Sequence, residues 1–240
     1  MRKVFGLCVF SVLASSFYGY GQPTNKEVEE AFEKGAKAYI NKDFNSAIIN
    51  YTKAIELDPR CVFAYGNRGD GYRNLKKYPE AIKDYTKVIE LDPKFIVAYH
   101  NRGYIYNELK KYPEAIADFT KAIELDPKLI SAYHNRGLAH TKHQKYHEAI
   151  ADHTKVIELD PKSVGAYFHR GLAFTGLEKY PESIADYTKA IELDPKLKLA
   201  YIGRAYTYES MGKTKEAEAD LAKAKELEKW NCTLSIAKGC

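Results

Sequence analysis

Hydrophobic residues recur with helical spacing along most of the chain, in a pattern that repeats every 34 residues. In the stretch KFIVAYHNRGYIYNELKKYPEAIADFTKAIELDP, apolar side chains lie three and four positions apart in two runs, Phe95 to Leu109 and Glu114 to Leu125. Pro113 stands where the first turn of a helix tolerates proline. The closing ELDP ends a helix, because proline disfavours helical backbone in the residue before it. Each unit is therefore predicted to be a helix, a short turn and a second helix.

The phrase ELDP occurs five times at this spacing and defines six units of equal length. Such a period indicates a repeat array, in which stacked neighbours bury a continuous core, rather than separate globular domains. The predicted units cover residues 26–59, 60–93, 94–127, 128–161, 162–195 and 196–229. Residues 22–25 are expected to be a short linker, and residues 230–240 an irregular C-terminal tail.

Small residues occupy equivalent positions in the two helices of each unit, where they would let the helix backbones approach closely. They are Gly35, Gly69, Gly103, Gly137 and Gly171 on the first helix, with Ala47, Ala81, Ala115, Ala149 and Ser183 on the second. Tyr or Phe recurs at positions around them. This pattern, 34 residues long and ending in proline, resembles the tetratricopeptide repeat over residues 26–229. The resemblance implies an all-α fold, an α-solenoid of six helix-turn-helix units forming a right-handed superhelix, with a concave groove that binds a peptide or protein.

The net charge and the N-terminal residues give expectations about the protein's partner and its location. The net charge is +5, and Lys and Glu are interspersed rather than grouped in blocks, which does not indicate a nucleic-acid partner. Residues 1–21 have a short basic end, an apolar stretch and then small residues, the layout of a secretory signal peptide. We expect an exported protein, periplasmic or secreted, with no membrane span after signal cleavage. The alternative is an uncleaved membrane anchor.

Arginine and aspartate recur together in five units, sixteen positions apart. The pairs are Arg68 with Asp84, Arg102 with Asp118, Arg136 with Asp152, Arg170 with Asp186, and Arg204 with Asp220. The first unit has Lys34 and Asn50 instead, so it lacks both partners. We predict a partly buried ion pair inside each of these five units, because a guanidinium can satisfy a carboxylate with two hydrogen bonds. The alternative is a row of arginines that binds an acidic ligand.

The resemblance places the first helices of the units along the groove, and it therefore predicts which residues line the groove. Apart from three asparagines, they are Phe63, Asp70, His100, Tyr104, His134, Leu138, Phe168, His169 and Leu172. This is a mixed surface without a dominant charge, better suited to a peptide with apolar anchors than to a phosphate backbone.

Asn67, Asn101 and Asn135 occupy one equivalent position in three successive units. An amide side chain offers a donor and an acceptor, as a peptide unit does. Packed helices lie roughly 10 Å apart and three extended residues span roughly the same distance, so each repeat could meet a ligand backbone. The arrangement is similar to the asparagine ladder of O-linked N-acetylglucosamine transferase. Alternatively, each Asn bonds a neighbouring helix or faces water.

The carboxylate clamp of heat-shock co-chaperones is a second family pattern that can be tested. Its positions, which require Lys, Asn or Arg, correspond here to Phe32, Ala36, Asn67, Val97 and Asn101. Only Asn67 carries the required residue type, so this clamp is not expected.

Histidines, cysteines and catalytic motifs are the remaining candidates for a chemical site in the sequence. Five of the seven histidines fall in the fourth unit, but their spacing is not that of metal ligands, and His140 and His153 replace aromatic core residues. Cys61 is expected to be buried and inert, and a bridge between Cys232 and Cys240 is possible. No phosphate-binding loop, nucleophile elbow or paired catalytic carboxylates are present in the sequence.

The sequence therefore favours a non-enzymatic interaction module, with no catalytic residues, metal or cofactor expected. Its partner would be a protein or peptide of unknown identity, held in the groove. The alternative function is a structural assembly factor, or scaffold, that uses its convex side or its ends within a larger envelope complex.

Overall fold

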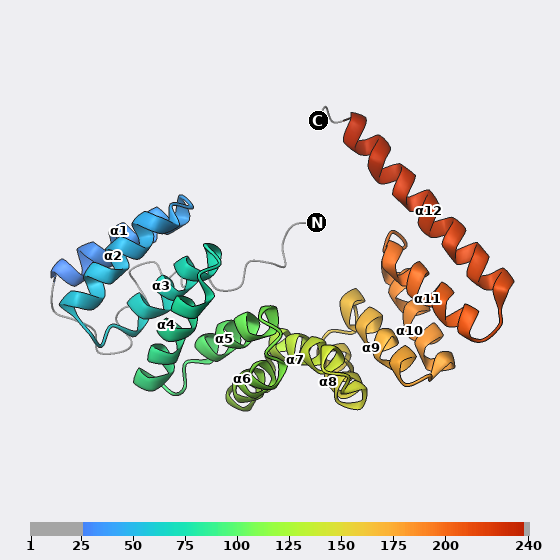
Figure 1. Cartoon of the computed structure of the whole chain (residues 1–240), viewed down its shortest axis with the longest axis horizontal. Helices are drawn as coiled ribbons and strands as arrows, with labels where there is room; N and C mark the ends of the chain where they lie inside the picture. The colour runs from blue at the N-terminus through green and yellow to red at the C-terminus, as the bar shows by residue number, and fades with distance from the viewer. Residues whose placement is uncertain (1–25, 238–240) are drawn as a thin grey trace. The chain divides into compact units, whose positions relative to one another are not determined.

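The computed structural model describes residues 26–237, with side chains described up to residue 228. This part of the chain forms twelve α-helices and contains no strand, and the helices follow one another in pairs (Figure 1). The helices are α1 Lys26–Ile40, α2 Phe44–Leu57, α3 Val62–Asn74, α4 Tyr78–Leu91, α5 Ile96–Glu108, α6 Tyr112–Leu125, α7 Ile130–Lys142, α8 Tyr146–Leu159, α9 Val164–Gly176, α10 Tyr180–Leu193, α11 Lys198–Ser210 and α12 Thr214–Ala237. The prediction of an all-α solenoid of helix-turn-helix units is confirmed.

The helices group into two compact units, which we call unit 1 (Met1–Asp126) and unit 2 (Pro127–Cys240). Unit 1 contains α1 to α6 and unit 2 contains α7 to α12. Within each unit the two helices of a repeat pack against each other, and the second helix also packs against the first helix of the next repeat. Within each unit, neighbouring repeats therefore bury each other's apolar faces, as expected when no repeat can cover its apolar face alone.

The repeated ELDP sequence ends the second helix of a repeat by two local interactions. Asp92 has extended backbone, with φ −136° and ψ 92°, so the helix stops directly before the proline. Its side chain then accepts a hydrogen bond of 3.0 Å from the backbone N–H of Lys94. Equivalent bonds follow Asp58, Asp160 and Asp194. The aspartate thus closes an Asx turn that directs the chain into the next repeat.

The turn inside each repeat contains one residue in left-handed backbone conformation. These residues are Lys42, Lys76, Lys110, Gln144 and Glu178, with φ between 57° and 62°, and Gly212 with φ 72°. Left-handed backbone is unfavourable for a residue with a Cβ. Five of the six turns therefore carry a local strain that helix packing must offset.

The small residues do bring the paired helices into close contact. A Cβ added to Gly103 would lie 3.1 Å from both the Asp118 Cβ and a Phe119 ring carbon. The facing residues of the second helices, such as Ala81 and Ala115, are fully buried. Aromatic rings pack beside them, and Tyr85 and Phe119 are completely buried as well.

The predicted pairing of arginine and aspartate within a repeat is confirmed. Arg102 donates from Nε and Nη2 to the two carboxylate oxygens of Asp118, at 2.8 and 2.7 Å. Its Nη1 donates to the Thr86 hydroxyl of the preceding repeat at 2.9 Å. The same threonine bond is found for Arg68, Arg170 and Arg204. These arginines are occupied by structural partners, which argues against the alternative of an acidic ligand.

The C-terminal end differs from the sequence-based expectation. The prediction of an irregular tail from residue 230 is wrong over residues 230–237, because α12 continues to Ala237. Its sequence holds no proline or glycine that would stop the helix. The predicted signal peptide at residues 1–21, the predicted linker at residues 22–25 and the side chains of Cys232 and Cys240 lie outside the described residues. Cys61 is buried, as expected, and burial raises the pKa of its thiol.

Candidate binding surface

In each unit, the exposed sides of the first helices form a candidate surface, which we call the first-helix face of that unit. It consists of residues on α1, α3 and α5 in unit 1, and of residues on α7, α9 and α11 in unit 2. In unit 2, α9 packs against both α7 and α11, so three first helices lie next to one another. Side chains at equivalent positions of these helices can therefore form a row.

Apolar side chains occupy one equivalent position of four first helices. They are Tyr104 on α5 in unit 1, and Leu138, Leu172 and Tyr206 on α7, α9 and α11 in unit 2. Tyr104 is 37% exposed, Leu172 is 41% exposed and Tyr206 is 67% exposed, whereas Leu138 is half-buried. Their repetition at one position of the first helices makes this face a candidate contact surface.

The three asparagines lie deeper than a ligand-contacting ladder requires. Asn67 and Asn101 are only 5% and 3% exposed, and Asn135 is half-buried. Asn101 donates from Nδ2 to Asp70 Oδ1 at 3.2 Å, which is the alternative of a bond to a neighbouring helix. A ligand role for these asparagines stays a prediction.

Asp70, expected to line the groove, is instead buried at 1% exposure. One of its oxygens, Oδ1, accepts hydrogen bonds from the Tyr85 hydroxyl at 2.7 Å and from Asn101, and lies 3.1 Å from Arg73 Nη2. The other, Oδ2, is buried and has no partner. Burial raises the pKa of Asp70 to about 6, and the Arg73 charge partly opposes this shift.

The remaining groove candidates of unit 1 are half-buried aromatic groups. Phe63 packs edge-on against Phe95, with ring centroids 5.9 Å apart. His100 packs against the Phe119 ring, with centroids 5.7 Å apart. Burial lowers the pKa of His100, so it is mainly neutral near pH 7. These side chains add apolar surface rather than charge.

Three histidines of unit 2 form one cluster, which we call the histidine cluster. His134, His153 and His169 come from α7, α8 and α9, and their ring centroids lie 5.4 to 5.6 Å apart. Phe168 packs beside it, 5.0 Å from the His169 ring. His153 is fully buried, and neither of its ring nitrogens has a hydrogen-bond partner.

The surroundings of the three imidazole rings in the histidine cluster strongly favour their neutral form. Burial, with the neighbouring His169 and His134, lowers the pKa of His153 to about 2. Burial and His134 lower the pKa of His169 to about 4, and burial also lowers the pKa of His134. Among the described residues, no group of three or more His, Cys, Asp or Glu side chains has an arrangement that could hold a metal ion.

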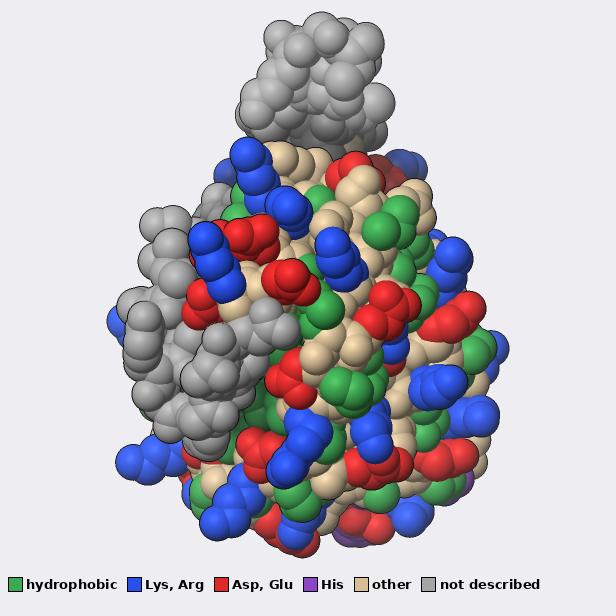
Figure 2. Space-filling view, turned by 90° about the vertical axis from the view of Figure 1, so that its left-hand side faces the viewer, with side chains coloured by type: hydrophobic (Ala, Val, Ile, Leu, Met, Phe, Trp, Pro, Cys, Tyr) green, Lys and Arg blue, Asp and Glu red, His purple; other side chains and the backbone are tan. Residues whose placement is uncertain are grey.

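The surface charge has no single sign on the side that Figure 2 displays. Lysine and arginine side chains alternate with aspartate and glutamate there. Several of these charges pair on one helix, as Lys121 does with Glu124 at 2.9 Å. Within residues 26–237, no helix is both long and apolar enough to cross a membrane.

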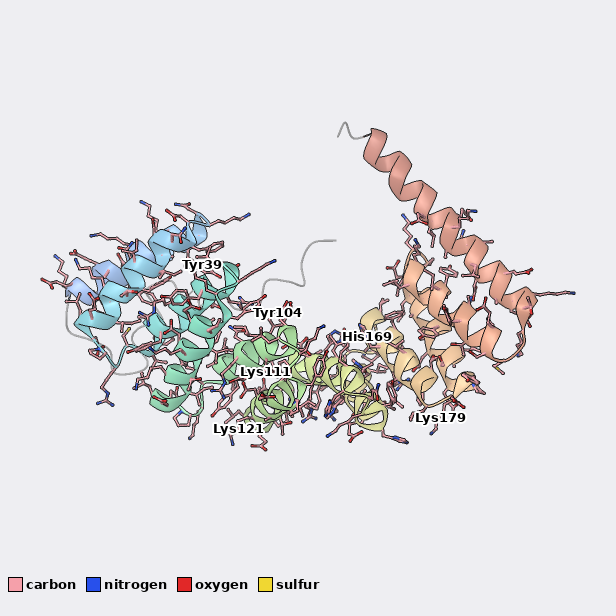
Figure 3. The ribbon with its side chains drawn as sticks, viewed as in Figure 1. Tyr39, Tyr104, Lys111, Lys121, His169 and Lys179 are labelled. Carbon is pink, nitrogen blue, oxygen red and sulfur yellow. The ribbon has the colours of Figure 1, made fainter. Side chains whose placement is uncertain are left out.

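Three groups of the first-helix face were missed from the sequence. Tyr206 could have been found from the 34-residue spacing that already links Tyr104 and Leu172. Arg73 and Tyr39 gave no such signal, because other repeats carry different residue types at their common position. Figure 3 places Tyr39 and Tyr104 along the same side of unit 1, and His169 on a helix of unit 2.

The chain belongs to the tetratricopeptide repeat family. Models of this family match residues 36–61, 62–95, 96–129, 130–163, 164–197 and 186–219. The matches cover most of the helical region and agree with the helix pairs of the structure. Proteins of this family bind peptides or proteins, so the chain is a protein-interaction module.

Solved structures with the same fold include a tetratricopeptide repeat protein from Parabacteroides merdae, at 28% identity and a TM-score of 0.75. That match covers 84% of this chain and 80% of the other. The MamA protein gives 27% identity and a TM-score of 0.68, covering 71% of this chain and 93% of MamA.

Among curated proteins, Hsc70-interacting protein 1 of Drosophila melanogaster is 44% identical over 57 residues. This stretch is 22% of the chain and only 15% of that relative. The similarity is thus one of repeat units rather than of whole proteins.

Proposed function

We propose that this chain is a non-enzymatic module that holds an extended segment of a partner protein on its first-helix face. The observation that carries the proposal is the row of exposed apolar side chains at one repeated position, Leu172 and Tyr206 above all. Helices packed roughly 10 Å apart match about three residues of an extended chain. A segment with an apolar residue at about every third position would therefore place one side chain on each first helix of unit 2.

The family and the named relative support this proposal. An Hsc70-interacting relative shows that closely similar repeat units occur in proteins that bind other proteins. The co-chaperone clamp residues differ here, since Phe32 and Val97 stand where the clamp requires lysine. We therefore propose a partner recognised by apolar anchors, and retain export as part of the proposal on the basis of residues 1–21.

The test compares the two sides of the helix pairs. A partner is first captured with the whole protein from the native exported fraction, and its affinity for the purified protein is measured by calorimetry. The double variant Leu172→Glu with Tyr206→Glu should weaken binding at least about tenfold, because two apolar contacts become buried charges. The matched control is Ile49→Glu with Leu221→Glu, which alters exposed residues of the second helices α2 and α12.

The control pair also tests the scaffold alternative. Unchanged affinity in the first-helix variant, with loss of binding in the second-helix variant, would replace the proposed function by a scaffold role. Circular dichroism of both variants must match the starting protein, so that a folding defect is not read as a binding defect.

A further inference from the structure

An imidazole ring in unit 2 occupies a position that other repeats give to a larger aromatic ring. His153 follows the equivalent Tyr85 and Phe119 and precedes Tyr187, and all four side chains are buried. The fit against α7 is tight, because a Cβ added to Gly137 would lie 2.8 Å from His153 Nε2. A polar ring thus fills a space built for an apolar one.

The polar atoms of this ring have no partners in the packed state. Neither Nδ1 nor Nε2 of His153 makes a hydrogen bond. Its ring lies 5.6 Å from the His134 ring of α7 and 5.6 Å from the His169 ring of α9, and those two rings lie 5.4 Å apart. Burying a polar atom without a partner costs free energy. The packed cluster therefore carries a cost that contact with water would relieve.

The buried aspartates that adjoin the cluster already have arginine partners. Asp152, next to His153 on α8, lies 2.7 Å from Arg136 on α7. Asp186 on α10 lies 2.7 Å from Arg170, the residue that follows His169 on α9. His140 on α7 is also within 3.8 Å of Asp152. A proton on the cluster would therefore have to compete with these pairs for a carboxylate.

The other charges that act on the cluster are positive. Lys142 on α7 lowers the pKa of His169, and Arg170 on α9 lowers the pKa of His153. Tyr187 on α10 packs against Phe168 at 5.8 Å and stays neutral, because burial raises its pKa. Two protonated rings at these distances would also repel each other. The packed cluster therefore resists protonation for reasons of geometry as well as burial.

The cluster is connected to the apolar row on the first-helix face of unit 2. His134 and Leu138 are four positions apart on α7, and His169 and Leu172 are three positions apart on α9, so each pair lies on one side of its helix. The ring of His153 packs against α7 and α9 at once. Separation of α9 from His153 would therefore change the spacing between Leu172 and Leu138.

We propose that the histidine cluster is an acid-operated latch that releases the segment bound on the first-helix face of unit 2. At neutral pH the three rings are uncharged and hold α9 against α7 and α8. In acid the rings gain protons by separating and reaching water, so the contact between α8 and α9 opens and the apolar row is disrupted. This inference rests on the proposed function and adds the condition that regulates it.

The direction of the pH effect follows from the protons that each state binds. Rings exposed to water in the open state titrate near their ordinary pKa of about 6.5. In the packed state the pKa of His169 is about 4 and that of His153 is about 2. The open state therefore binds more protons below about pH 6.5 and gains population as the pH falls. Each of these two rings favours opening about twentyfold more at pH 5 than at pH 7.

The first experiment is NMR spectroscopy of the whole protein without ligand, at pH 7 and pH 4.5. At pH 7 we expect proton–proton contacts between the ring of His153 and the rings of His134 and His169. At pH 4.5 these contacts should be lost, and signals of ionised rings should replace those of neutral rings. The signals of Tyr201 on α11 should keep their native dispersion, because opening between α8 and α9 leaves the last helix pairs packed.

A double variant removes the titrating rings and keeps residue types that other repeats carry. His153→Phe introduces the residue type of Phe119, and His169→Asn introduces that of Asn135, the equivalent residue of α7. This variant should stay packed at pH 4.5. His169→Asn alone retains the buried His153 and should reduce the acid response about twentyfold at pH 5. His147→Gln changes an exposed histidine of the fourth repeat and should open as the starting protein does.

The second experiment tests release with a probe that has no titratable group. The probe is a peptide of three Leu-Ser-Ser units with acetylated and amidated ends, which carries leucine at every third position. Calorimetry should show binding at pH 7 that weakens at least about tenfold at pH 4.5. The double variant should bind the probe equally at both pH values, within about twofold.

Several outcomes would overturn the latch. They are ring contacts that persist at pH 4.5, an equal acid response in the double variant, or loss of all native signals of unit 2 at one pH, which indicates general unfolding. Opening that leaves the affinity for the probe unchanged would remove the release role. Normal opening without any probe binding at pH 7 would instead contradict the proposed function and leave only the acid-driven change of structure.

Discussion

At the residue scale, the ion pair of Arg102 and Asp118 was predictable from the sequence alone. The first repeat lacks both partners, and this joint absence was enough to predict that they contact each other. The structure adds the bond from Arg102 to Thr86, which ties one repeat to the preceding one. The threonine was not predicted, because its position alone gives no indication of which neighbouring helix it faces.

Removing one member of this pair should destabilise the fold strongly. We predict that Arg102→Met lowers the free energy of unfolding by about 3 kcal/mol, because Asp118 is left buried without its partner. Urea denaturation measures the loss. The double variant Arg102→Met with Asp118→Leu should recover most of it.

Lys34→Met is the matched control, because Lys34 occupies the equivalent position of the first repeat and is exposed. It should change stability by less than about 0.5 kcal/mol. Similar losses in Arg102→Met and Lys34→Met would show that the ion pair contributes little.

At the element scale, the helices were predictable and the turns between them were not. The helical runs Phe95 to Leu109 and Glu114 to Leu125 agree with α5 and α6 to within about two residues. The left-handed residue of each turn was missed, because Lys110 and its equivalents are not residues that normally mark such a conformation. Only Gly212 carried the usual sequence signal.

Gly212 allows this backbone strain to be measured. A Cβ added there would meet no atom within 4 Å, so any cost of Gly212→Ala must come from the backbone, where φ is 72°. We predict a loss of about 1 kcal/mol in thermal or urea unfolding. Lys110→Gly removes the steric cost of the same left-handed backbone conformation. It should not destabilise the protein, except through the greater conformational freedom of the unfolded chain. A neutral Gly212→Ala variant would refute the interpretation.

At the scale of the whole molecule, acid should destabilise unit 2 more than unit 1. In unit 2, the folded pKa values of His134, His140, His153 and His169 are all lowered by burial. Unfolding then takes up protons as the pH falls from about 6.5 toward the folded values, so stability is lost. In unit 1, Asp70 has a raised folded pKa, so its contribution grows as the pH falls below about 6.

We predict that hydrogen exchange protection, corrected for intrinsic rates, falls in residues 130–176 between pH 7 and pH 5 but is retained around α3. His153 alone should contribute roughly 2 kcal/mol of the loss at pH 5. The double variant His140→Tyr with His153→Phe restores the aromatic residue types of other repeats and should flatten the response. His147→Gln, which changes an exposed histidine of the same repeat, is the control. A uniform response across both units would contradict this prediction.

The candidate site was only partly accessible from the sequence. Tyr104 and Leu172 were expected on the first-helix face and are exposed there. Asp70 was expected there too, but the hydroxyl of Tyr85 and the amide of Asn101 hold it in the interior. Side-chain depth depends on partners from other helices, which a single helix pattern does not reveal.

The sequence by itself determined the repeat, the helix pairs, their stop signals and the ion pair inside five of the six repeats. These features depend on local backbone preferences and on a period that recurs in every copy. Only the tertiary structure decided which polar groups are buried, how Arg73 pairs with the buried Asp70, and how His134, His153 and His169 form one cluster. Such arrangements arise where residues from different repeats converge at positions that the repeat pattern leaves variable, so their chemistry depends on three-dimensional packing.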